Sequence, residues 1–208
     1  LTITYDRWRI EKQNTIGLFG EENHIALDLL RRLSAGNGNC AAVTTNPSVV
    51  RDTAINADAL PLFAAAGLCP FGDVARVEDN YANLDTRTVE GHDIGIYYEF
   101  DSRFGSFDMR YVGSFLDTYD QEAGGFASEL VNAKAEGTLP ESLPVVGFSS
   151  LVQQNGNPER KDTLRASWSK GDWGANATAL RYGDFFQVLS DGRNWAIPSM
   201  TTMNVSLD

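Results

Sequence analysis

Residues 90–116, EGHDIGIYYEFDSRFGSFDMRYVGSFL, decide the fold. They alternate as two β-strands joined by a tight turn within residues 101–105. The first strand carries one mostly apolar face, consisting of His92, Ile94, Ile96, Tyr98 and Phe100. The return strand continues that face with Phe107, Met109, Tyr111 and Phe115, and charges or glycines occupy most of the opposite positions. A soluble β-sandwich strand has the same pattern, so the hairpin predicts an antiparallel sheet and leaves its surroundings open.

Four more stretches have strand alternation: residues 1–12, 161–169, those from Trp173 onward, and 202–208. The connections between the six strands run long, short, long, short and medium, and the medium one is an expected loop over residues 189–198. The first long connection predicts helices around residues 25–33 and 59–66, and the second predicts one over 126–135. Successive antiparallel strands place successive connections at opposite ends. All the long connections should therefore lie at one end and all the tight turns at the other.

This sorting of connections is typical of outer-membrane barrels, which have tight periplasmic turns and long extracellular loops. The sequence predicts an all-β fold: a segment of a transmembrane antiparallel up-and-down barrel with about six strands and short helices in its extracellular loops. About eight strands is the usual minimum for closure. Both ends of the chain, Leu1 and Asp208, fall in mid-alternation. We therefore expect residues 1–208 to be part of the barrel domain of a longer polypeptide, with two open edges.

Composition excludes some classes of partner. The net charge of -11 and the pI of about 4.6 make nucleic acid a poor partner, because phosphate binding needs clustered Lys and Arg. The longest nearly apolar run, residues 60–68, is shorter than the roughly 20 residues of a membrane helix. Cys40 and Cys69 lie in a Gly-, Asn- and Ala-rich region, and we predict that they form a disulfide in an oxidising compartment. Two unpaired thiols are the alternative.

Several stretches resemble a known family. Residues 72–84, 88–100 and 157–168 are similar to late barrel strands of TonB-dependent outer-membrane receptors. Residues 197–207 resemble the strand that often follows an extracellular loop in that family, and residues 5–10 are also similar. The resemblance implies a barrel of roughly 22 strands in the bacterial outer membrane, in contact with its lipid, with extracellular loops and a plugged lumen. It also implies energy-coupled import of a scarce nutrient: an iron chelate, a vitamin or an oligosaccharide.

In this family a TonB-type inner-membrane partner passes energy to the receptor through the plug domain. These residues contain no counterpart of the plug or of the segment that contacts that partner. We therefore assign energy coupling to no residue here and expect the plug and the remaining strands elsewhere in the polypeptide.

The sequence contains no nucleophile elbow, phosphate-binding loop or zinc motif, so we expect neither an enzyme nor a cofactor or metal. Two groups are candidates for binding. We predict that Asp93, Glu99, Asp108, Arg110, Lys161 and Arg165 face a polar lumen or contact a plug, or else pair with each other across strands. We predict that Asp191, Arg193, Asn194 and Trp195 contact the ligand at a loop tip, the alternative being that Trp195 only packs on its own neighbours.

Two other functions fit the same sequence. An extracellular binding or adhesion β-domain that is complete as given predicts a water-soluble monomer of 22.8 kDa. A passive porin predicts a similar wall without a plug.

Overall fold

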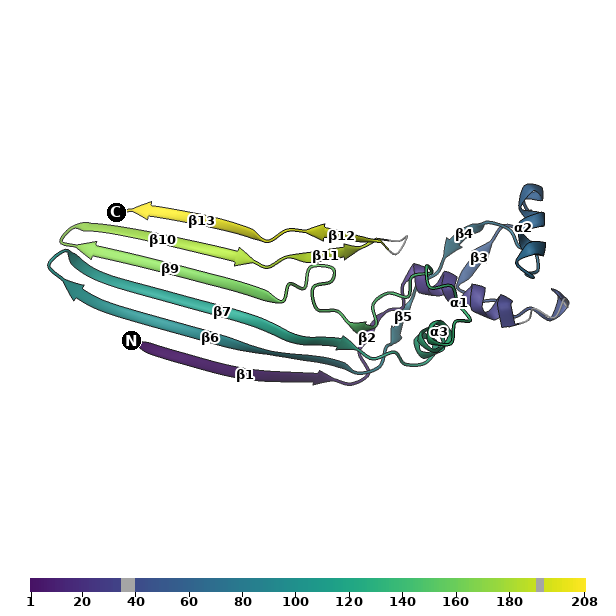
Figure 1. The fold of residues 1–208 in the computed structure, drawn as a ribbon, viewed down its shortest axis with the longest axis horizontal. Coiled ribbons are helices and arrows are strands. Elements are labelled where there is room, and N and C mark those ends of the chain that lie inside the picture. The colour runs from purple at the N-terminus through teal and green to yellow at the C-terminus, as the bar shows by residue number, and fades with distance from the viewer. Residues whose placement is uncertain (35–39, 190–192) are drawn as a thin grey trace.

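The computed structural model describes residues 1–34, 40–189 and 193–208. It is mostly β, with 49% strand and 17% helix, and the sheets are antiparallel. The six expected long strands are present (Figure 1). They are β1 (Thr2–Lys12), β6 (Arg87–Ser102), β7 (Gly105–Gln121), β9 (Arg160–Lys170), β10 (Trp173–Tyr182) and β13 (Met200–Leu207).

The six strands lie in one sheet in their sequence order, β1-β6-β7-β9-β10-β13, and the short β8 (Ser149–Ser150) adds to the end of β7. The central hairpin pairs from Ser102 opposite Gly105 to Arg87 opposite Gln121, with one irregularity between Glu90 and Gly91. This confirms the tight turn predicted within residues 101–105. In the described part of the chain the sheet is open, with β1 and β13 at its edges.

The connections are sorted as the sequence predicts. Both tight turns lie at one end of the sheet, beside the two chain ends, and the long connections lie at the other end (Figure 1). The long connections contain α1 (Glu21–Ser34), α2 (Leu60–Ala65) and α3 (Phe126–Ala135), which confirms the three predicted helices. We call the described parts of these two connections, residues 13–86 and 122–159, the cap.

The cap contains short strands that the alternation pattern did not predict. Residues 72–84, which resemble a barrel strand, contribute two of them, Val74–Val77 and Tyr81–Asn83, and no strand of the large sheet. β2 (Ile16–Leu18) pairs with β5 (Tyr81–Asn83), and β3 (Val49–Arg51) pairs with β4 (Val74–Val77). In the third connection β11 (Phe185–Val188) pairs with β12 (Asn194–Ile197), so the prediction of a plain loop over residues 189–198 was wrong for its second half. Strands of three or four residues alternate too briefly to be recognised without their partners.

Helix α1 shows how local chemistry and a distant residue define an element together. Gly20, with φ of +99°, precedes the helix, and the Asp79 carboxylate accepts the N–H groups of Phe19 (3.2 Å) and Gly20 (3.0 Å). Glu21 and Glu22 occupy the first turn and Arg31 and Arg32 the last, which complements the helix dipole. The helix start therefore depends on a carboxylate about 60 residues away in the chain.

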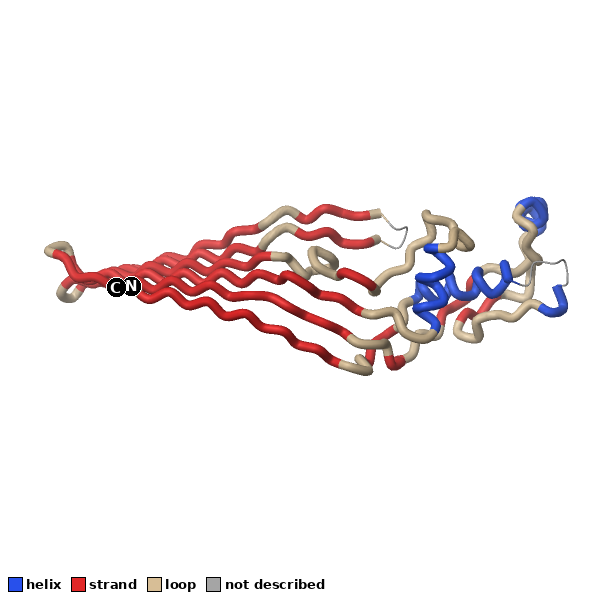
Figure 2. The backbone as a smooth tube through the Cα atoms, turned by 60° about the horizontal axis from the view of Figure 1, so that its bottom comes forward, coloured by secondary structure: helices blue, strands red, loops and turns tan. Residues whose placement is uncertain are grey.

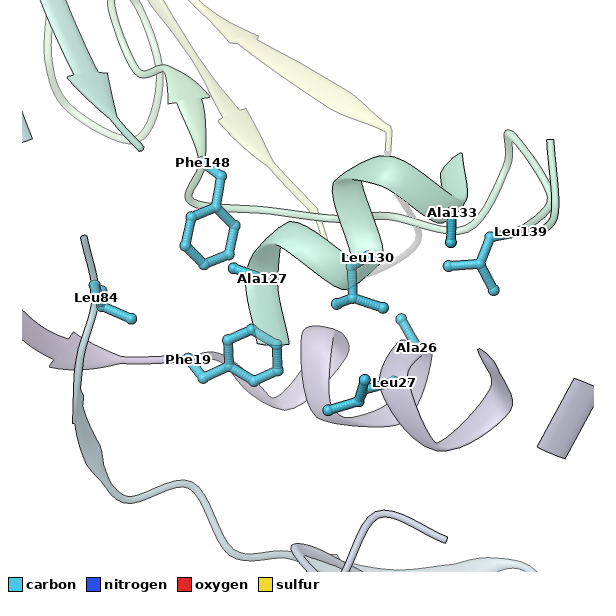
Figure 3. Close-up of a cluster of buried hydrophobic side chains, with 9 residues drawn as sticks. All are labelled: Phe19, Ala26, Leu27, Leu84, Ala127, Leu130, Ala133, Leu139 and Phe148. Carbon is cyan, nitrogen blue, oxygen red and sulfur yellow. The ribbon is translucent and has the colours of Figure 1, made fainter. Parts of the chain in front are cut away.

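The hydrophobic core lies in the cap. α1 contributes Ala26 and Leu27, and α3 contributes Ala127, Leu130 and Ala133, at helical spacing on facing surfaces (Figure 3). The cluster is completed by Phe19, Leu84, Leu139 and Phe148. Among the described residues, no buried hydrophobic side chain belongs to the six long strands. Those strands form a single layer with the helices beyond one end (Figures 1 and 2).

Among the residues that the structure describes, no helix is both long and apolar enough to cross a bilayer.

Candidate functional site

One face of the sheet is an apolar band, and strand register sets its composition. Opposite residues in neighbouring strands share a face, so each register position gives a row across the sheet. Three successive rows are apolar from β6 to β13. They consist of Phe100, Phe107, Trp168, Ala175 and Leu207; Tyr98, Met109, Ala166, Ala177 and Val205; and Ile96, Tyr111, Leu164, Ala179 and Met203. We call these rows the apolar band.

The apolar band is uncovered and has aromatic residues at its tight-turn end. Val205 and Leu207 are 69% and 79% exposed. The rings of Phe100 and Phe107 stack at 4.8 Å between centroids. Trp173, beside the second tight turn, is 73% exposed. The indole N–H of Trp168 donates to the carbonyl of Phe104 at 2.8 Å, which fixes the first tight turn against β9.

At the opposite margin the same face becomes charged. Arg160 pairs with Asp162 at 2.9 Å, and the Tyr111 hydroxyl donates to Asp162 at 2.6 Å. Arg9 pairs with Glu90 at 3.0 Å on the neighbouring strands. The apolar band is thus bounded by aromatic rings on one side and by ion pairs on the other. From Trp173, beside the second tight turn, to Ala179, in the last apolar row, the distance along β10 is roughly 20 Å, given the rise per residue of a β-strand.

The other face carries all the residues predicted to face a lumen. By register, Asp93, Glu99, Asp108, Arg110, Lys161 and Arg165 share it. Four of them, Glu99, Asp108, Arg110 and Arg165, line a concavity of about 900 Å³ near the tight turns. Its lining also includes Ser167, Asn176 and Asp208 and, from the apolar rows, Phe100, Phe107 and Trp168. Asp93 and Lys161 lie farther along the same face, and the ammonium of Lys161 is 5.9 Å from the ring centroid of Tyr182. The structure thus brings the predicted residues together on one surface.

Like charges lie directly opposite each other on this polar face. Glu99 is opposite Asp108, and Arg110 is opposite Arg165. Asp93 is likewise opposite Asp6 in β1. In the described part of the chain, the only ion pair within the predicted set joins Arg110 to Asp108, two positions away on the same strand, at 2.9 Å. Like charges directly opposite each other are destabilising unless water, a partner or a diagonal neighbour of opposite charge compensates them.

Of the four residues predicted to contact the ligand at a loop tip, the structure places two at one cavity. Asp191 lies outside the described residues. Arg193 and Asn194 line a cavity of about 400 Å³ between the β11–β12 hairpin and the second long connection. Trp195 is 65% exposed. Lys134 and Glu141 also line this cavity, which gives it a mixed charge.

The cap is held by a buried ionic centre that the sequence analysis did not find. Asp28 is fully buried and pairs with Arg32 (2.8 Å) and Arg51 (3.0 Å). Both guanidinium groups lie over the ring of Phe71, at 4.5 and 4.3 Å. The i,i+4 spacing of Asp28 and Arg32 was visible in the sequence, but Arg51 and Phe71 reach the site only through the tertiary fold.

Close by in the chain, the predicted disulfide between Cys40 and Cys69 is confirmed.

A second buried polar group joins the two long connections. Asn23 is fully buried. Its amide donates to the carbonyls of Phe19 (2.5 Å) and Val146 (2.9 Å) and accepts the N–H of Val146 (3.0 Å). Nearby, His24 uses one ring nitrogen on Asp79 (3.2 Å) and the other on Asn46 (3.1 Å). The cap is therefore one body built from two connections.

In the described part of the chain, no group of three or more His, Cys, Asp or Glu side chains is arranged to hold a metal ion. No protein-family model, curated protein or solved structure matches this chain.

Proposed function

We propose that this chain forms part of the wall and ligand mouth of a TonB-dependent outer-membrane transporter, which imports a scarce nutrient across the bacterial outer membrane. The observation that carries the proposal is the two-faced sheet. It has an uncovered apolar band on one side and a concave polar surface with opposed like charges on the other.

The apolar band needs a covering that the described residues do not supply. Exposed apolar surface is unfavourable in water by roughly 25 cal/mol per Å². Monomeric soluble proteins rarely expose a contiguous patch larger than a few hundred Å². Lipid covers such a band in a transmembrane barrel, where aromatic girdles mark the two interfaces. Phe100, Phe107 and Trp173 suit the periplasmic interface, and the ion pairs around Asp162 suit the outer one.

The opposed charges favour a hydrated lumen behind the wall. Two pairs of like charges face each other here, Glu99 with Asp108 and Arg110 with Arg165. In a lumen, water or a plug domain compensates their repulsion. In the dry interior of a sandwich the same charges would be buried without compensation. The open edges, β1 and β13, pair with further strands in this proposal, because six strands do not close a barrel. The cap then stands on the extracellular side, together with the β11–β12 hairpin that carries Asn194 and Trp195.

Cysteine labelling on β13 tests the wall. Single variants Asn204→Cys and Val205→Cys occupy neighbouring positions on opposite faces. The two native cysteines are joined to each other and do not compete for label. In outer membranes containing the full polypeptide, a membrane-impermeant maleimide should label Asn204→Cys at least tenfold faster than Val205→Cys. Equal labelling of the two positions would refute the lipid-facing assignment.

Two further measurements separate the alternatives. A transmembrane barrel should shift in mobility between unboiled and boiled samples on a denaturing gel, whereas a soluble adhesion domain should run near 22.8 kDa with no shift. Uptake that stops on adding a protonophore indicates energy coupling. Uptake that continues indicates a passive porin.

A further inference from the structure

The cap contains a cavity that differs in chemistry from the polar concavity and from the hairpin cavity. It has a volume of about 400 Å³ and lies between β5 and the start of α3, so both long connections contribute to it. Its lining contains no Asp, Glu, Lys or Arg, although the chain carries a net charge of -11. The hairpin cavity, by contrast, is lined by Lys134, Glu141 and Arg193.

The inner wall of this cavity is apolar and firmly held. Phe19, Leu84 and Ala127 form it, and all three belong to the buried core. Figure 3 shows them at one end of that core, together with Phe148. The site is therefore preformed by the packing of α1 against α3. Its volume falls within the range of small-ligand pockets.

The rim offers two aromatic rings and several free polar groups. Tyr81 is 76% exposed and Phe126 is 55% exposed. The guanidinium of Arg31, a residue of α1, lies 5.0 Å from the ring centroid of Phe126 and restrains that ring. In the described part of the chain, the side chains of Ser48, Asn80 and Asn83 make no hydrogen bond, so their hydroxyl and amides are available. His24 is not available, because both its ring nitrogens are used within the cap.

We propose that this cavity binds a neutral sugar residue of an oligosaccharide. A charged ligand would lose water here without gaining an opposite charge, which is strongly unfavourable. A wholly apolar ligand would leave the amides and hydroxyl of the rim unpaired. A neutral sugar ring carries no charge and still offers polar groups to the rim. Its C–H face packs on aromatic rings, and its hydroxyl groups hydrogen-bond to amides. This inference rests on the proposed function and narrows its nutrient to a neutral carbohydrate.

An array of neutral and acidic oligosaccharides tests the inference, with the full polypeptide purified in detergent as the probe protein. We expect binding to neutral glycans and none to glycans whose only sugars are sialic or uronic acids. Tyr81→Ala should weaken binding at least tenfold, and Tyr81→Phe, which keeps the ring, less than threefold. Asn83→Ala should weaken binding several-fold. Because Tyr81 and Asn83 are exposed, these variants should fold normally, and the gel-mobility shift checks that they do.

Leu62→Ala is the matched control, since it removes a side chain of the cap that is 72% exposed and does not line this cavity. It should change neutral-glycan binding less than twofold. Trp195→Ala reports separately on the rival site at the β11–β12 hairpin. Binding only to acidic glycans, no binding to any neutral glycan, or loss of binding in Trp195→Ala but not in Tyr81→Ala would each overturn the assignment. If no neutral glycan binds while the β13 labelling and the mobility shift hold, this inference fails and the transporter proposal stands. If those two tests fail, the transporter proposal falls whatever the array shows.

Discussion

The cap and the long-stranded sheet are stabilised by different means within one chain. The cap buries its own hydrophobic cluster around Leu27 and Leu130 and encloses the ionic centre at Asp28. The sheet buries no large hydrophobic side chain in the described residues, and its ion pairs, such as Arg9 with Glu90, are partly exposed. The cap resembles a small globular protein, whereas the sheet relies on backbone pairing and on whatever covers its apolar band.

This difference shows where function can vary. A cap with its own core and disulfide can hold binding residues in fixed positions even though it is formed from connections. Long connections usually need such internal support to be ordered. The long-stranded sheet requires only that its strands keep their pairing register and that apolar and polar residues alternate between its two faces. The effect of a substitution should therefore depend mainly on which of the two regions contains it.

The largest effect is expected at the ionic centre of the cap. Asp28→Ala leaves two largely buried guanidinium groups without their carboxylate, and breaking such a buried pair costs about 3–5 kcal/mol. Hydrogen exchange in α1 of the full polypeptide should report this loss, and labelling of β13 should stay unchanged. Asp28→Asn, which keeps the shape, should lose less. Normal protection of α1 in Asp28→Ala would mean that the cap does not depend on this centre.

The next largest effect tests the covering of the apolar band. Ala177 lies in its middle row, between Ala166 and Val205. Ala177→Arg should lower the free energy of unfolding in lipid vesicles by about 2–4 kcal/mol, the cost of an arginine near the bilayer midplane. The matched variant Asn176→Arg, on the polar face, should lower it by under about 1 kcal/mol. Equal losses at the two positions would contradict a lipid covering.

A smaller effect is expected where the two long connections meet. Asn23→Ala removes the amide that bonds both backbone groups of Val146 and leaves these partly buried groups without their partner. A buried group left unsatisfied costs about 1–3 kcal/mol. Limited proteolysis should then cut residues 140–150 faster. Asn80→Ala, which removes an exposed amide with no partner in the described chain, should leave the rate unchanged, and a similar rate in both variants would show that Asn23 does not join the connections.

The smallest effect is expected at the margin of the sheet. Arg9→Gln removes the ion pair with Glu90, in which the arginine side chain is 62% exposed. Exposed pairs contribute about 0–1 kcal/mol, and salt weakens them further. Unfolding in vesicles at low and high salt should therefore differ little between this variant and the parent protein. A loss comparable to that of Asp28→Ala would remove the distinction between the two regions.

The sequence by itself determined the sheet and the placement of its connections. Side-chain direction alternates residue by residue along a strand, so the two faces of residues 90–116 were readable without any tertiary contact. The same holds for the six long strands, the ends occupied by the connections and the three helices, because strand alternation, helical spacing and turn residues are local properties. The disulfide was predictable because the chain has only two cysteines.

Only the tertiary structure decided the interior of the cap. Asn23 meets Val146 across 123 positions, and Asp79 completes the start of α1 from about 60 positions away. The short strand pairs and the uncharged cavity at Tyr81 likewise need partners from distant segments. Local pattern cannot specify which distant polar groups will be buried together. That depends on packing between segments whose distance apart in the sequence follows no repeating pattern. The opposed like charges of the polar face also emerged only when strand register placed Arg110 beside Arg165.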